Sequence, residues 1–210
     1  MSEKFMMNYN EMQEREYIND FVKLYGGSKI SVYKPNDELP GLIMKGGKDE
    51  NKSLISSGLG KLHFNGRNFT GVEVMMNVSV EFDVESEDMN ILIDQMYDLC
   101  RNQAIGYCDG YVVRSCDTTA KFRERFGYEY VVFLSGIKRI KITDVGDIMI
   151  LLALPMYEEE YQLYLGWFDK EKSRDELIDR IIDYYEEKKI HPLAVDVERS
   201  LMIREGRGLS

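Results

Sequence analysis

The sequence predicts an α/β (α+β) protein with a single mixed β-sheet domain and flanking helices. Apolar and polar side chains alternate from Val72 to Asp83, as in a strand with one face on the core and the other largely wet. The run Ile148–Leu154 is apolar at every position, which is typical of a central strand covered on both faces. Stripes of apolar residues at helical spacing precede, separate and follow these strands. At 210 residues and 44% hydrophobic, the chain can bury one substantial core.

The N-terminal part predicts a helix followed by short strands. Apolar residues recur at helical steps over Glu3–Tyr25, and two glycines then end the run as a C-cap would. We therefore expect residues 1–27 to form a helical extension packed on a domain that spans 28–210. Ile30–Tyr33 and Leu54–Gly58 are typical of short strands, and polar, glycine-bearing loops lie between them.

The second half predicts alternating strands and helices. A helix is expected to begin at Ser86, with acidic residues in its first turn, and to fade near Gly106. The central strand is expected to stop at Pro155, and a capping box at Ser173 opens the last helix. The remaining elements are predicted as strands at Tyr111–Val113, Tyr130–Leu134 and Ile137–Ile142, a loop or short helix at Asp117–Gly127, and helices at Met156–Leu165 and Arg174–Lys188.

The amino-acid composition limits the classes of molecule that the chain is expected to bind. The chain has 27 basic and 37 acidic residues, a net charge of −10, which disfavours binding to nucleic-acid phosphates. The acidic surface has two interpretations, namely solubility or complementarity to a basic protein partner. No apolar run approaches the roughly 20 residues of a membrane span, and no secretion signal is expected at the start. Three cysteines in no recognisable pairing pattern favour a reducing cytoplasm.

The sequence predicts no catalytic residue, no metal site and no cofactor. His63 and His191 lack neighbours at metal-ligand spacing, and the three glycine-bearing loops match neither phosphate-binding pattern. There is no nucleophile elbow, and Cys108 and Cys116 have no adjacent histidine. Paired carboxylates are expected by chance in so acidic a chain. Glu73 alone stands out, as a structural partner for an arginine or lysine.

Three short motifs in order carry a resemblance to a known family. Ser56–Gly60 (SSGLG), followed by Gly71–Val74 (GVEV), resembles the S/T-x-G-L-S and x-E-L opening of suppressor-of-fused-like (SUFU) domains. Leu151–Glu160 places a proline and a glutamate where those domains have P-I-S/T-x-x-E, and Asp196–Ser200 (DVERS) resembles their closing D-x-x-R-S. The resemblance covers roughly residues 28 to 203. It implies structural roles for Gly58, Glu73, Pro155, Glu160, Asp196, Arg199 and Ser200.

The resemblance also implies a function without catalysis. Bacterial members of the family look like immunity proteins (antitoxins), which bind and neutralise a cognate polymorphic toxin domain, here expected to be a basic nuclease. One alternative is a SUFU-like scaffold that sequesters another cytoplasmic regulator, and a second is an enzyme whose site leaves no motif. Contacts to the toxin are expected from acidic residues at helix starts, Glu85, Glu87, Asp88, Glu158 and Glu159. No nucleic-acid or membrane partner is expected.

Overall fold

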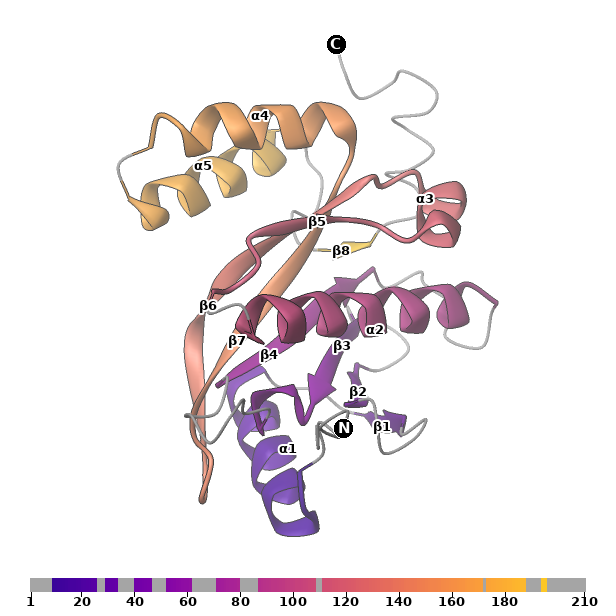
Figure 1. Cartoon of the computed structure of the whole chain (residues 1–210), viewed down its shortest axis with the longest axis vertical. Helices are drawn as coiled ribbons and strands as arrows, with labels where there is room; N and C mark the ends of the chain where they lie inside the picture. Colours follow the sequence, from indigo (N-terminus) through magenta and orange to yellow (C-terminus); the bar gives the residue numbers. More distant parts are fainter. Residues whose placement is uncertain are drawn as a thin grey trace.

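The computed structural model contains a mixed β-sheet with helices on both faces (Figure 1). It describes residues 9–25, 29–33, 40–46, 52–61, 71–79, 87–108, 111–171, 173–187 and 194–195. The strands are β1 (Ile30–Tyr33), β2 (Gly41–Lys45), β3 (Lys52–Ser57), β4 (Val72–Val78), β5 (Ser115–Asp117), β6 (Tyr130–Ile142), β7 (Gly146–Met156) and β8 (Ala194–Val195). The helices are α1 (Glu11–Tyr25), α2 (Glu87–Cys108), α3 (Ala120–Phe126), α4 (Glu158–Phe168) and α5 (Arg174–Glu187), with a 3-10 turn η1 at Leu59–Lys61.

The strands follow the order β1-β2-β3-β4-β7-β6-β5, and β8 pairs with β4. β4 runs parallel to β7 and to β8, whereas the other paired strands are antiparallel. β7 thus lies between β4 and β6, and its residues Ile148 and Leu151 are almost fully buried on opposite faces. This confirms the prediction of a central strand covered on both sides.

Side chains of β7 point alternately to the two faces of the sheet, and their contacts show which helices cover each face. Leu151 and Ala153 pack in a cluster with residues of α2 and α3. Ile148 and Ile150 join a cluster with α1, while Leu154 and Met156 join one with α4 and α5. The molecule therefore has α2 and α3 on one face of the sheet, and α1 with the α4–α5 pair on the other (Figure 1).

The prediction of a half-wet strand at Val72–Asp83 is wrong for the part that the structure describes. Glu73 and Met75, which belong to the supposed wet face of β4, are 0% and 6% exposed. Tyr17 and Phe21 of α1 are completely buried in the cluster that contains Met75, so α1 covers that face. Alternation alone did not reveal this cover, because the covering helix comes from a distant part of the chain. The division of the chain at residue 27 stays a prediction.

Three element boundaries also differ from the sequence predictions. Residues 111–113 precede β5 rather than forming a strand, and they are partly or fully exposed. β6 is one strand where two were expected, with an irregular register between Ser135 and Arg139. β7 continues through Pro155, which pairs with Val131. The proline is tolerated because β4 pairs with β7 only as far as Leu152, so Pro155 lies beyond that ladder.

Candidate functional site

The carboxylate of Glu73 lies at the centre of a buried hydrogen-bond network. Its Oε1 accepts from the Tyr9 hydroxyl at 2.6 Å and from the backbone N–H groups of Gly58 and Gly60 at 2.9 Å each. Its Oε2 accepts from the Ser56 hydroxyl at 2.5 Å. The Ser56 oxygen in turn accepts from the N–H of Val74, so β3 and β4 are joined by side chains as well as by their ladder.

Glycines shape the loop that surrounds this carboxylate. Gly58 has a φ of 123°, a conformation that favours glycine, and it turns the chain from β3 into η1. A Cβ placed on Gly60 would lie 2.8 Å from the Ile148 side chain and 2.8 Å from the Tyr9 hydroxyl. The sequence Gly58-Leu59-Gly60 therefore allows the backbone to approach Glu73 closely enough to donate both N–H groups.

Burial governs the protonation of these groups. Desolvation raises the pKa of Glu73, although its hydrogen bonds to Ser56, Tyr9, Gly60 and Gly58 oppose the rise. Burial and the neighbouring Glu73 raise the pKa of the Tyr9 phenol, and the same two causes raise the pKa of Cys100. The prediction of an arginine or lysine partner for Glu73 is wrong, because its carboxylate is bound by hydroxyl and backbone N–H groups instead. The arrangement ties the fold together and presents no acid to solvent.

The two other family-motif residues that the structure describes also lie inside the protein. Pro155 is buried within β7. Glu160 is 5% exposed, and its carboxylate accepts from the N–H of Tyr157 at 3.0 Å, which satisfies the N-cap N–H at the start of α4. Asp196, Arg199 and Ser200 lie outside the described residues.

The predicted partner-binding acids do not form one surface. Glu87 and Asp88 begin α2, and Glu158 and Glu159 begin α4 on the opposite face of the sheet. Asp88 already forms two hydrogen bonds with the Arg125 guanidinium, at 2.5 and 2.7 Å, so its charge is compensated. Glu158 accepts from Gln162 at 2.7 Å, and Glu159 is exposed. Glu85 lies outside the described residues.

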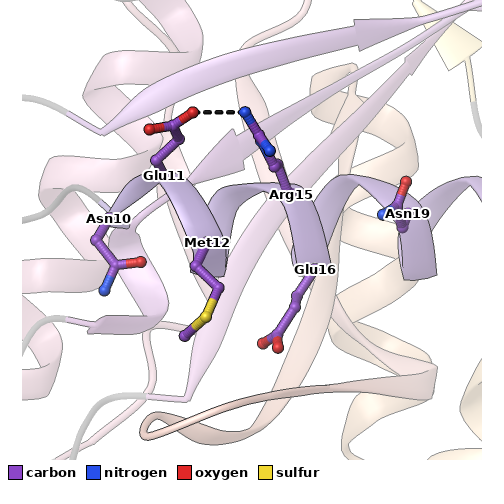
Figure 2. A pocket seen from close by; sticks show the side chains of 6 residues that line it. All are labelled: Asn10, Glu11, Met12, Arg15, Glu16 and Asn19. Atoms are coloured by element: carbon purple, nitrogen blue, oxygen red, sulfur yellow. Dashed lines mark hydrogen bonds and ion pairs between the residues drawn. The ribbon is translucent and has the colours of Figure 1, made fainter.

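Two hollows on the surface differ in the groups that line them. One of about 570 Å³ lies along α1, and Figure 2 shows its side chains projecting from that single helix, with only Glu11 and Arg15 meeting. Another, of about 520 Å³, lies between α2 and α3 and is lined by acidic and basic side chains, namely Glu87, Asp94, Glu124, Lys121 and Arg125. Within the described ranges, no three His, Cys, Asp or Glu side chains are placed to hold a metal ion. None of the helices described is long and apolar enough to cross a membrane.

An aromatic row runs from β6 along the flank of α4. It consists of Tyr130, Tyr161, Tyr164 and Phe168, with successive ring centroids 4.1, 6.0 and 6.0 Å apart. The Arg114 guanidinium lies 5.1 Å from the centre of the Phe168 ring. This row was not predicted from the sequence, although the i, i+3, i+7 spacing of its α4 members was a signal for a shared helix face.

Three acidic residues adjoin Tyr130 at the β6 end of the row. Asp117 pairs with Tyr130 across β5 and β6, Glu129 precedes it in the chain, and Glu158 begins α4, whose Tyr161 stacks on the Tyr130 ring. A hydrogen bond to Glu158 raises the pKa of the Tyr130 phenol, with further contributions from desolvation and from the charges of Glu158, Glu129 and Asp117. We call Asp117, Glu129 and Glu158 the acidic corner. Within the part of the chain that the structure describes, none of the three forms an ion pair. The aromatic row and the acidic corner together are the candidate site.

Comparison with known proteins identifies the fold. No family model matches the sequence, and no curated protein matches it. A solved structure from Neisseria gonorrhoeae, described as a homologue of suppressor of fused (SUFU), superposes with a TM-score of 0.57 at 15% identity, covering 88% of this chain and 94% of the other. The chain has a SUFU-like fold. The predicted fold class is thus confirmed, while the immunity branch of the family stays a prediction.

Proposed function

We propose that this chain is an immunity protein that binds a cognate toxin domain of basic surface and neutralises it by covering that surface, without catalysis. The observation that supports the proposal best is the acidic corner, whose three carboxylates have no ion-pair partner among the described residues. The net charge of −10 and the SUFU-like fold point in the same direction.

Electrostatics explains how such a protein would act. A toxin that attacks nucleic acid needs a basic cleft to hold phosphates. An acidic inhibitor is steered toward that cleft and excludes the substrate once bound. Because long-range attraction between exposed charges is screened by salt, the rate of association should fall as ionic strength rises.

Co-expression tests the proposal. Each toxin domain encoded in the genomic neighbourhood of this chain is induced alone or together with the chain, and growth and co-purification are measured. We expect the chain to restore growth with one toxin and to purify with it as a complex. A matched control is an unrelated acidic protein of similar size, which should give no rescue.

Two outcomes would overturn the proposal. One is equal killing by every neighbouring toxin in the presence and absence of the chain. The other is capture of a cellular regulator from the native cytoplasm in the absence of any toxin, which would favour the SUFU-like scaffold instead.

A further inference from the structure

We propose that the aromatic row and the acidic corner form the surface that receives the partner, and that they take a lysine or arginine side chain flanked by apolar residues. This inference rests on the proposed function and specifies the site at which it operates. The acidic corner would bind the cation, and the exposed end of the row would cover the apolar flanks.

Exposed apolar side chains extend from the row. Leu165 and Phe168 at the end of α4 are 37% and 40% exposed, and Tyr111 and Val112 in the segment before β5 are 56% and 41% exposed. The stacking of Arg114 on Phe168 places that segment beside α4. The hydrogen-bond contact between Ser115 and Tyr161, at 3.0 Å, links the two elements again. Aromatic and arginine side chains of this kind are enriched at the centres of protein interfaces.

The charge of the surface selects a basic occupant. Some exposed acids elsewhere already have basic partners, as in the pairs Glu11–Arg15, Asp20–Lys23 and Asp94–Lys121. Among the described residues the acidic corner has none, so an incoming cation would gain attraction without displacing an internal partner.

The same charge argues against two other occupants. Phosphates of nucleic acid and anionic lipid headgroups would both be repelled by three uncompensated carboxylates. Apolar contact at Leu165 and Phe168 would in turn discriminate against a purely polar basic segment. The surface therefore fits a protein segment that carries both features.

Paired substitutions on α4 and α1 test the site. Glu158→Lys reverses one charge in the acidic corner, and Glu11→Lys makes the same change on α1. Phe168→Ser removes an exposed aromatic from the row, and Leu163→Ser removes a side chain that is 42% exposed on another flank of the same helix. Affinity for the toxin domain identified by co-purification, and for a synthetic peptide of alternating arginine and leucine, is measured by calorimetry. Circular dichroism confirms that each variant is folded.

We expect Glu158→Lys and Phe168→Ser to weaken binding of both probes by tenfold or more, while Glu11→Lys and Leu163→Ser change it less than about threefold. Leu165→Ser replaces Phe168→Ser if the latter fails to fold. If Glu158→Lys and Glu11→Lys weaken binding of the probes equally, the attraction is a diffuse effect of charge and the proposed site is wrong. If the wild-type chain protects against a toxin and the row and corner variants protect equally well, the site is wrong while the proposed function stands. If the wild-type chain protects against none, the proposed function itself fails.

Discussion

The Tyr9 hydroxyl donates a 2.6 Å hydrogen bond to Glu73, which lies 64 residues further along the chain. This contact joins the segment before α1 to β4 near the middle of the sheet. A second contact, from the Tyr17 hydroxyl to the carbonyl of Ser56 at 3.1 Å, strengthens the same connection. The beginning of the described chain is therefore held by buried polar bonds as well as by apolar packing.

Removal of either side chain of the Tyr9–Glu73 hydrogen bond should lower the stability of the fold. Glu73→Ala leaves several buried donors without an acceptor, and we expect it to reduce the free energy of unfolding by about 3–5 kcal/mol. Tyr9→Phe removes a single hydroxyl and should cost about 1–3 kcal/mol. Urea unfolding, followed by the fluorescence of the single tryptophan, Trp167, measures both. The control Tyr111→Phe, at a residue 56% exposed, should change stability by less than about 0.5 kcal/mol.

The raised pKa of Glu73 predicts a dependence of stability on pH. Because burial raises that pKa above its ordinary value of 4.5, the folded state binds the proton more tightly than the unfolded chain does. The stabilising contribution is complete below pH 4.5 and is lost as pH rises through the folded-state pKa. Relative to Glu73→Gln, which cannot titrate, the wild-type free energy of unfolding should therefore fall as pH rises above 4.5. If the difference in free energy of unfolding between the wild type and Glu73→Gln rises with pH instead, the four hydrogen-bond donors lower the pKa of Glu73 more than burial raises it.

Two glycines should respond oppositely to replacement by alanine. In Gly60→Ala the new Cβ would lie 2.8 Å from both Ile148 and Tyr9, and the resulting strain should cost about 1–3 kcal/mol. Gly166 lies within α4, and a Cβ added there would meet nothing within 4 Å, so Gly166→Ala should gain about 0.5–1 kcal/mol from helix propensity. Thermal unfolding of the two variants provides the test, and destabilisation of both would contradict the reasoning.

Two thiols should react slowly in the folded protein. Cys100 is 1% exposed and burial raises its pKa, while burial, with the charge of Asp98 next, raises the pKa of Cys116 to about 12. Near pH 8 the thiolate fraction of Cys116 is then on the order of one in ten thousand. In a Cys108→Ser background, alkylation by iodoacetamide should be slow without urea and fast with it, as measured by mass spectrometry. Rapid labelling of the native protein would contradict the burial of Cys100 and the raised pKa of both thiols.

Local patterns predicted much of the fold. The apolar run at Ile148–Leu154 indicated the central strand, because a strand covered on both faces is apolar at every position. Capping signals placed the start of α5 correctly, and Ser173 and Glu176 exchange the expected hydrogen bonds. The environment of Glu73 could not be predicted in this way. Its partners come from the segment before α1 and from the β3–η1 turn, and only the folded chain brings them together.

The candidate site was predicted only in part. Glu158 was identified from its place in the first turn of a helix, but Asp117 and Glu129 were not, because they lie on and beside strands that converge in space. Asp88 has the same kind of sequence context as Glu158, yet Arg125 compensates its charge. A place in the first turn of a helix was therefore enough to select a candidate acid. Whether that acid is available to a partner depended on ion pairs with residues distant in the sequence.

The parallel pairing of β4 with β7 has a consequence for synthesis on the ribosome. Val72 pairs with Met149, so a nascent chain that has not yet extended beyond residue 146 carries β4 with one edge unpaired. The first half of the protein can form its antiparallel strands early, but the open edge of β4 is paired only after β7, and then β8, has emerged from the exit tunnel. Translation speed through the intervening segment thus sets how long the unpaired backbone groups of that edge are open to aggregation or to chaperones.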